Sequence, residues 1–278
     1  MNQIGVMQGR LTPPVDGRIQ AFPKEDWRQE FDSAKVCGLD LIEWVVDVGD
    51  GDWSSNPLID DPSAILNEMQ RTGVSVKSVC ADYFMTHRFL RVDHAVRSRH
   101  LALLEGLIDK VAAIDARHIV LPFVDASAIY DDSEFPLIVD CLREALDHAK
   151  ESGIKLLFET SLDPARFKRL LDLAKHDALM VNYDIGNSAS LGYNPTDEIG
   201  TYGPHIATVH VKDRVLGGTT VALGRGDADF TAVFSALRKQ RYQGPFILQV
   251  ARGRDGQEME QVKDYTAFVH RHLNQGLL

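Results

Sequence analysis

The chain has 278 residues, 44% of them hydrophobic and 25% charged, and its 40 acidic and 30 basic residues give a formal net charge of −10. This composition is typical of a globular chain that is long enough for two small domains or for one (β/α)8 barrel. The negative charge repels polyanions, so nucleic acid is not an expected partner.

The three cysteines indicate a reducing compartment. Cys37, Cys80 and Cys141 are far apart and lie in apolar segments, which favours neither a disulfide framework nor a CxxC metal site. The sequence has no run of about 18 apolar residues and no basic N-terminal stretch followed by a long apolar core. We therefore expect a cytoplasmic protein without a membrane partner.

Along the chain, short apolar runs of strand length alternate with stretches of helical periodicity. The predicted strands are 2–7, 39–45, 74–80, 117–122, 155–159, 178–184, 206–210 and 246–249. The predicted helices are 27–37, 62–72, 92–114, 135–152, 164–175, 199–202 and 230–240, and a polar, Gly-rich loop is expected at 47–53. Eight strands that alternate with helices, without a linker, predict an α/β fold, a single (β/α)8 TIM barrel domain over 1–278. A doubly wound sheet is disfavoured because no GxGxxG turn follows the first strand.

Four consecutive predicted strands end on polar side chains, namely Glu159, Asp184, His210 and Gln249. Ligands bind at the C-terminal ends of parallel strands, so we expect these four side chains to form one site. They offer three oxygen donors and one imidazole nitrogen, and two ionised acids match the charge of a divalent cation. The pattern therefore predicts one divalent metal ion, Mn, Mg, Co or Zn.

Several motifs give the chain a resemblance to a known family. They are Met-Gln-Gly-Arg at 7–10, Ile-Glu at 42–43, Phe-Glu at 158–159, Asp-Ile-Gly-Asn at 184–187, His-Val-Lys-Asp-Arg at 210–214, Leu-Gly-Arg-Gly at 223–226 and Asp-Phe at 229–230. Over nearly its whole length the sequence resembles the sugar phosphate isomerases and epimerases with a xylose isomerase-like barrel, a group that includes endonuclease IV. The resemblance implies a small sugar or sugar phosphate as substrate. It also implies one metal held by Glu, Asp, His and Glu, which map onto Glu159, Asp184, His210 and Gln249.

Two positions depart from the family pattern. Gln249 replaces the second glutamate of the two-base members, so it retains a metal-binding oxygen but cannot titrate. Asn187 stands where ketose 3-epimerases often carry a histidine, and we assign it to substrate binding. Glu159 is then expected to remove the proton next to a carbonyl alone, through an enediolate, as an isomerase requires. Glu43 and Asp82 are candidates for a proton donor on the opposite face or for binding substrate hydroxyls.

Cations and glycines follow the predicted strand 206–210, on the side where barrels commonly bind phosphate. They include Lys212, Arg214 and Arg225, together with Gly217 and Gly218, whose N–H groups are suited to close approach by an anion. Arg252 and Arg254 extend the same rim after the last strand. Lys212, Arg214 and Arg252 are therefore predicted to bind the substrate.

Two other functions are compatible with these residues. In a metal-dependent lyase or dehydratase, Glu159 would form an enolate that expels a β-hydroxyl group, and Gln249 would be no handicap. In a catalytically altered barrel that only binds sugar, Gln249 would be the signature of lost activity. Endonuclease IV chemistry requires a cluster of metals and a DNA-binding face, and the sequence indicates neither. Whether the chain forms a homo-oligomer stays open.

Overall fold

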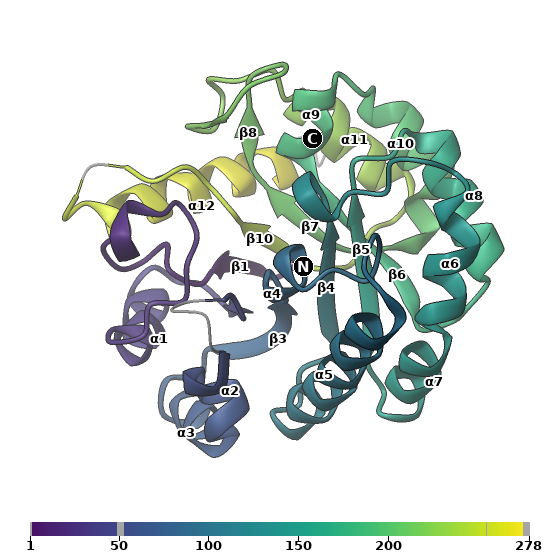
Figure 1. Cartoon of the computed structure of the whole chain (residues 1–278). Coiled ribbons are helices and arrows are strands. Elements are labelled where there is room, and N and C mark those ends of the chain that lie inside the picture. Colours follow the sequence, from purple (N-terminus) through teal and green to yellow (C-terminus); the bar gives the residue numbers. More distant parts are fainter. Residues whose placement is uncertain (1, 49–52, 254, 275–278) are drawn as a thin grey trace.

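Eight parallel strands close a barrel in the computed structural model, which describes residues 2–48, 53–253 and 255–274 (Figure 1). Their order around the barrel is β1-β10-β7-β6-β5-β4-β3-β2. The strands are β1 (Ile4–Met7), β2 (Leu41–Val45), β3 (Ser75–Cys80), β4 (His118–Phe123), β5 (Lys155–Thr160), β6 (Leu179–Asp184), β7 (Ile206–Val211) and β10 (Phe246–Leu248). The predicted (β/α)8 TIM barrel is confirmed. Arg254 and positions 49–52 of the predicted loop lie outside the described residues.

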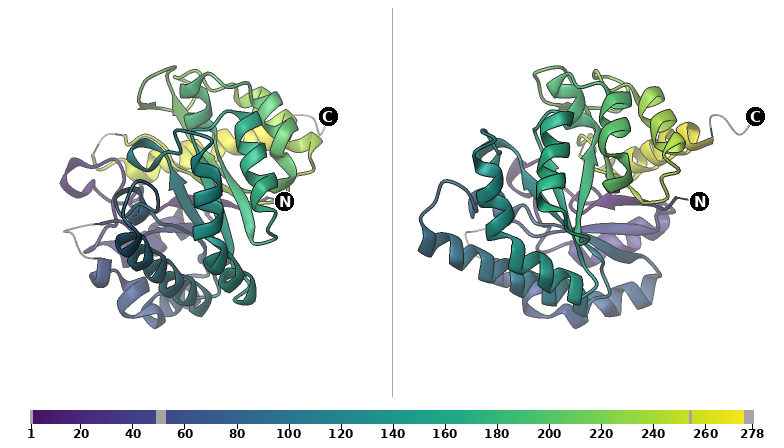
Figure 2. Two further views of the ribbon diagram at one scale, coloured as in Figure 1. Left: turned by 45° about the vertical axis from the view of Figure 1, so that its right-hand side comes forward. Right: turned by 90° about the vertical axis from the view of Figure 1, so that its right-hand side faces the viewer.

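Helices surround the barrel on its outer side, as two rotated views show (Figure 2). They are α1 (Trp27–Val36), α2 (Pro57–Asp60), α3 (Pro62–Thr72), α4 (Tyr83–Thr86), α5 (His94–Ala113), α6 (Glu134–Cys141), α7 (Arg143–Glu151), α8 (Pro164–Ala174), α9 (Ile185–Leu191), α10 (Pro195–Tyr202), α11 (Phe230–Lys239) and α12 (Glu258–Asn274). Short 3-10 turns are η1 (Val15–Gly17), η2 (Trp53–Ser55), η3 (Asp125–Ser127) and η4 (Gly203–His205). Within the described ranges, no helix combines the length and apolarity needed to cross a membrane.

The helix α8 illustrates how the local sequence determines an outer helix. The Asp163 side chain accepts a hydrogen bond from the N–H of Arg166, and Pro164 occupies the first helical position. Both features favour a helix start, because Asp satisfies a free N–H group and Pro needs none. Phe167 and Leu171, one turn apart, then present an apolar face to the core.

Some helices differ from the predictions. The helix predicted over 135–152 is interrupted at Leu142, which separates α6 from α7. The backbone of Leu142 stays in the right-handed helical region (φ −90°, ψ 0°), and its side chain is fully buried. The helices α2, α4, α9 and α12 were not predicted. The run Ile-Gly-Asn-Ser-Ala-Ser-Leu of α9 has weak helix propensity. A two-stranded hairpin of β8 (Asp213–Arg214) and β9 (Thr220–Val221) was also missed.

Two apolar regions stabilise the barrel. The larger lies between the strands and the surrounding helices. The smaller fills the barrel interior with Met7, Leu41, Val45, Cys80, Val120, Leu157 and Ile247. Alternate strand residues point to the same side, so Glu159 and Gln249, two positions after Leu157 and Ile247, share the inner face. The apolar interior therefore ends where the polar strand ends begin.

Candidate functional site

A cavity of about 420 Å³ lies at the C-terminal ends of the barrel strands. Its volume is in the range of small-molecule sites, and its place is the usual one for active sites of this architecture. The lining includes the predicted site residues Asp82, Glu159, Asn187, Lys212, Arg214 and Gln249. Asp184, His210, Glu43 and Arg252 are not among the lining residues.

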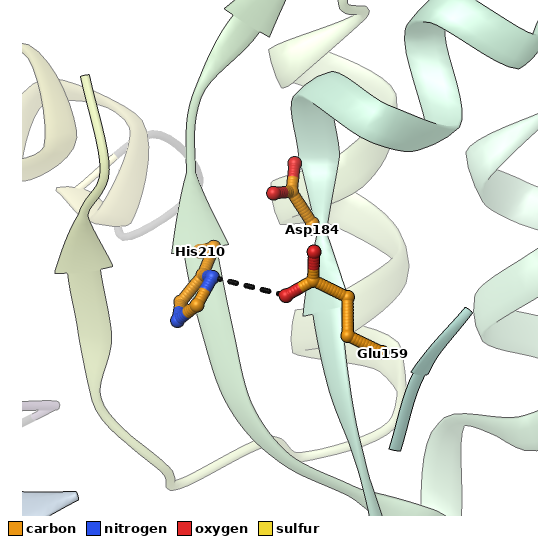
Figure 3. Close-up of side chains that lie close together, drawn as sticks. All are labelled: Glu159, Asp184 and His210. Atoms are coloured by element: carbon orange, nitrogen blue, oxygen red, sulfur yellow. Dashed lines mark ion pairs between the residues drawn. The ribbon is translucent and has the colours of Figure 1, made fainter. Parts of the chain in front are cut away.

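Three predicted metal ligands meet at one point of the site. Ligand atoms of Glu159, Asp184 and His210 all lie within 4.8 Å of one another, and each of the three side chains is buried (Figure 3). They come from the adjacent strands β5, β6 and β7, where Asp184 and His210 are paired in register. Two carboxylates and an imidazole are donors that divalent metals accept in proteins. The donor set therefore fits a divalent ion.

His210 is oriented by a carboxylate on the far side of its ring. Its Nε2 lies 2.6 Å from Glu43 Oε2, and both side chains have 0% exposure. Its Nδ1 makes no hydrogen bond and lies 3.3 Å from Glu159 Oε2, on the side of the three-residue cluster. Burial opposes the charged ring, but Glu43 and Glu159 outweigh it and raise the pKa of His210 to about 10. Glu43 is thus placed to hold His210 rather than to contact a substrate hydroxyl.

The carboxylate of Glu159 is fixed by two amides. Its Oε1 accepts from Asn187 Nδ2 and its Oε2 accepts from Asn182 Nδ2, both at 2.7 Å. Thr208 Oγ1 in turn donates to Asn182 Oδ1 at 2.6 Å. Asn187 was predicted to bind substrate, and it both lines the cavity and orients Glu159. Asn182 was missed, although its position two residues before Asp184 places it on the same face of β6.

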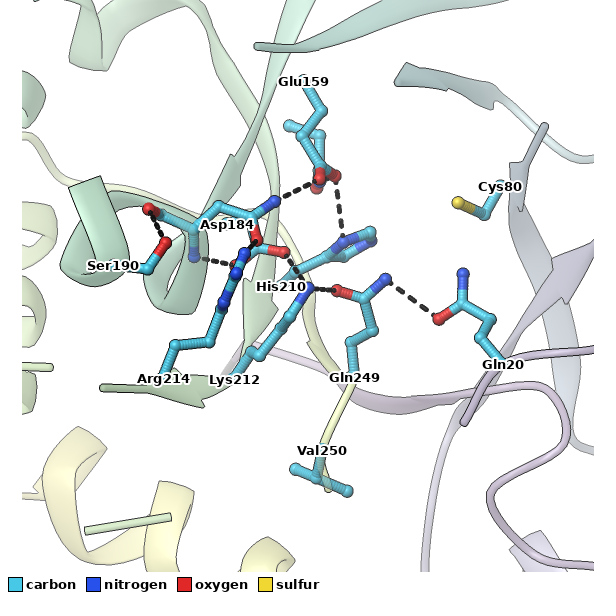
Figure 4. Close-up of polar contacts among 12 residues, drawn as sticks. Gln20, Cys80, Glu159, Asp184, Ser190, His210, Lys212, Arg214, Gln249 and Val250 are labelled. Atoms are coloured by element: carbon cyan, nitrogen blue, oxygen red, sulfur yellow. Dashed lines mark hydrogen bonds and ion pairs between the residues drawn. The ribbon is translucent and has the colours of Figure 1, made fainter. Parts of the chain in front are cut away.

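Lys212 joins two of the predicted metal ligands. Its Nζ donates to Asp184 Oδ2 and to Gln249 Oε1, each at 2.9 Å (Figure 4). The approach depends on Gly186, because a Cβ there would lie 2.7 Å from Lys212 Cγ. The side-chain oxygen of Gln249, the atom predicted to bind a metal, accepts from this ammonium group. Lys212 therefore places a fixed positive charge beside the candidate metal ligands.

The loop after β7 is organised around the protein's own carboxylate. Asp213 is fully buried, and its Oδ2 accepts from the N–H groups of Gly224, Arg225 and Gly226 at 2.8, 3.1 and 2.9 Å. These N–H groups converge as in an anion-binding concavity, but an internal anion already occupies it.

Gly217 and Gly218 are also engaged within the loop. Gly217 N–H donates to Ser190 O, and Gly218 N–H donates to Val215 O. The prediction that these two N–H groups bind an external anion is wrong, because each already has a carbonyl partner.

The two predicted arginines have different surroundings. Arg214 lines the cavity, where its Nη1 donates to Asn187 Oδ1 at 2.9 Å while Nε and Nη2 donate to Gly218 O. Arg252 instead donates to the carbonyl groups of Gly9, Thr12 and Ile19. Arg252 thus holds the segment after β1 in place, and it does not line this cavity.

Comparison with known proteins gives the sequence relationship. The chain matches the family model of the xylose isomerase-like TIM barrel over residues 31–270. The L-ribulose-5-phosphate 3-epimerase UlaE of Salmonella paratyphi A is 27% identical over 238 residues, which are 81% of this chain and 82% of that protein.

Solved structures agree with the fold at lower identity. The structure of L-ribulose 3-epimerase has a TM-score of 0.80 and 17% identity, covering 99% of this chain and 95% of the other. The IOLI protein with a bound zinc atom has a TM-score of 0.78 and 15% identity, covering 98% of each chain. At these identities the likeness establishes the fold.

Proposed function

The chain belongs to the xylose isomerase-like TIM barrel family, and from this premise we propose that it is a divalent-metal-dependent isomerase or epimerase of a small ketose or ketose phosphate. The observation that carries the proposal is the cluster of Glu159, Asp184 and His210 beside the cavity at the strand ends. The reaction proposed is removal of a proton from the carbon next to a carbonyl, which produces an enediolate.

Glu159, Asp184 and His210 are the residues that would hold the metal. A divalent ion bound there supplies a Lewis-acid contact that stabilises negative charge on the substrate's carbonyl and neighbouring hydroxyl oxygens. The contact with Glu43 supports this assignment, because it engages Nε2 of His210 and leaves Nδ1, on the side of the cluster, without a hydrogen bond. A carboxylate that orients a ligand histidine in this way typically strengthens metal binding.

Glu159 is the proposed base. Asn182 and Asn187 hold its two oxygens in fixed positions, so the carboxylate is oriented before the substrate arrives. Such preorganisation lowers the cost of reaching the transition state. Glu159 also lines the cavity, where a substrate carbon has access to it.

A phosphate group is the proposed anionic part of the substrate, since the UlaE relative is an L-ribulose-5-phosphate 3-epimerase. Arg214 and Lys212 are the cationic side chains in the cavity lining, within the described part of the chain. The hydroxyl groups of Ser161, Ser190 and Thr220 line the same cavity. Guanidinium and hydroxyl donors are the groups that recognise phosphate in proteins.

The test is turnover by the purified protein after metal removal and after loading with Mn²⁺. L-ribulose 5-phosphate and L-ribulose serve as substrates in D2O, and NMR follows deuterium entry next to the carbonyl and the appearance of a new sugar. We expect Mn²⁺-dependent deuterium entry, and Glu159→Gln should abolish it for the epimer from which Glu159 removes the proton. Release of water to a deoxy product would identify a lyase instead. No exchange with these or other ketoses and ketose phosphates would refute the proposal.

A further inference from the structure

A directed chain of hydrogen bonds runs along the cavity wall from Lys212 to Asp82. Lys212 Nζ donates to Gln249 Oε1 at 2.9 Å, and Gln249 Nε2 donates to Gln20 Oε1 at 3.0 Å (Figure 4). Gln20 Nε2 then donates to Asp82 Oδ2 at 2.5 Å. Every donor points the same way, from an ammonium group to a carboxylate. Both ends of the Gln249 amide are therefore engaged.

Asp82 is a cavity carboxylate that the charge of the buried Arg10 influences without an ion pair, since Arg10 Nη2 donates to Gln20 Oε1 at 3.1 Å. No lysine, arginine or histidine in the described ranges forms an ion pair with it, and its oxygens accept only from Gln20 and, at 3.2 Å, from Cys80 Sγ. Burial and the negative charges of Glu159 and Asp47 raise the pKa of Asp82 to about 6. A carboxyl group with a pKa of about 6 is suited both to donate and to accept a proton near neutral pH.

Among the two carboxylates that the sequence offers for a second proton transfer, the structure favours Asp82. Glu43 is fully buried against His210 and does not line the cavity. Asp82 and Glu159 both line the cavity, from the ends of β3 and β5. A substrate in the cavity therefore has access to both carboxyl groups.

We propose that Asp82 is a second proton-transfer residue, which acts on the reacting carbon from the face opposite to Glu159. The proposal rests on the proposed function. Glu159 takes the proton, and the electron pair of the broken C–H bond enters the enediolate. Protonated Asp82 then gives its proton to the same carbon, and the new C–H bond has inverted configuration. Glu159 is left protonated and Asp82 ionised, and proton exchange with water restores both.

Gln249 suits this arrangement better than a glutamate does. Its Nε2 and Arg10 Nη2 both donate to Gln20 Oε1, at 3.0 and 3.1 Å, and together they orient the Gln20 amide so that its own N–H group reaches Asp82. A carboxylate at position 249 has no N–H donor and would face the Gln20 oxygen. In this proposal Asp82, at the end of β3, has the second proton-transfer role that a glutamate at position 249 would have at the end of β10.

The experiment separates proton removal from inversion. Mn²⁺-loaded wild type, Asp82→Asn and Glu159→Gln are incubated in D2O with L-ribulose 5-phosphate and, separately, with its C3 epimer, L-xylulose 5-phosphate. We expect Asp82→Asn to lower interconversion at least ~100-fold. It should still introduce deuterium at C3 of one epimer within about tenfold of the wild-type rate. Glu159→Gln should show the mirror pattern, with exchange only in the other epimer.

Control variants separate catalysis from folding and from loss of charge. Asp82→Glu should restore part of the interconversion, and Asp82→Asn should bind Mn²⁺ with wild-type stoichiometry. Asp125, an exposed aspartate on the rim of the same cavity, provides the matched charge control. Asp125→Asn should change exchange and interconversion in equal proportion.

Three results would overturn the role of Asp82. They are interconversion by Asp82→Asn within tenfold of wild type, equal loss of exchange and interconversion in that variant, and conversion of the ketose to an aldose by the wild type without epimer formation. Absence of any exchange by the wild type with all sugars tested would instead refute the proposed function itself.

Discussion

Metal binding at the proposed site should be strongly pH dependent, because His210 must lose a proton before its Nδ1 can bind a metal. Glu43 and Glu159 raise the pKa of His210 to about 10, so the metal-free ring is protonated at neutral pH. Below this pKa, each metal ion bound should release one proton, and affinity should rise about tenfold per pH unit. At pH 7, about three units below the pKa, proton competition should weaken binding about 1,000-fold, or about 4 kcal/mol.

The assay is calorimetric titration of the metal-free protein with Mn²⁺ between pH 6.5 and 8.5, in buffers of different ionisation enthalpy. The buffer dependence gives the number of protons released, and the expected value is one per metal. In Glu43→Gln the charge 2.6 Å from Nε2 is removed, so the ring is less readily protonated and affinity should level off at lower pH.

Glu198→Gln is the matched control. Glu198 is also a buried carboxylate, but it accepts from Tyr183, Ser188 and Tyr202, away from the three-residue cluster. Its substitution should lower stability and leave the pH slope of metal binding unchanged. Wild-type affinity that is independent of pH between 6.5 and 8.5, with no proton release, would show that His210 is not a ligand or is not protonated.

Three other expectations concern single residues. Asp184→Ala should lose most of its bound metal, as measured by elemental analysis, and wild-type metal content would contradict the role of Asp184 as a ligand. The variant should also lose about 1 kcal/mol of stability, because Asp184 caps α9 through the N–H of Asn187. Arg214→Met and Lys212→Met should raise KM for L-ribulose 5-phosphate more than for L-ribulose. If each variant changes KM for the two sugars equally, the phosphate contact is rejected. Burial lowers the pKa of His118 to about 4, so the free energy of unfolding should fall by up to about 3 kcal/mol as the pH drops from 6.5 to 4. Urea unfolding of His118→Gln should show a correspondingly smaller fall, and an identical fall would refute the assignment.

The sequence by itself determined the barrel and the shared level of its polar strand ends. Alternating apolar runs and helical periodicities predict βα units, and strand geometry then places Glu159, Asp184 and His210 at one end of a closed sheet. These inferences succeed because they depend on local periodicity and on the direction of parallel strands. The interruption at Leu142 and the helix α9 were not predicted, because neither follows from hydrophobic periodicity.

The partner of each polar side chain was decided only by the tertiary structure. Glu43 and Asp82 follow similar predicted strands, yet one is buried against His210 and the other lines the cavity. Arg214 and Arg252 likewise differ in their contacts, since the first donates to Asn187 in the cavity lining and the second to the carbonyl group of Thr12. Such outcomes depend on side-chain direction and on contacts between residues as far apart as Gln20 and Gln249, and no local pattern encodes them. Hydrogen bonds are short-ranged and directional, so the roles of these groups follow from distances that only the folded chain sets.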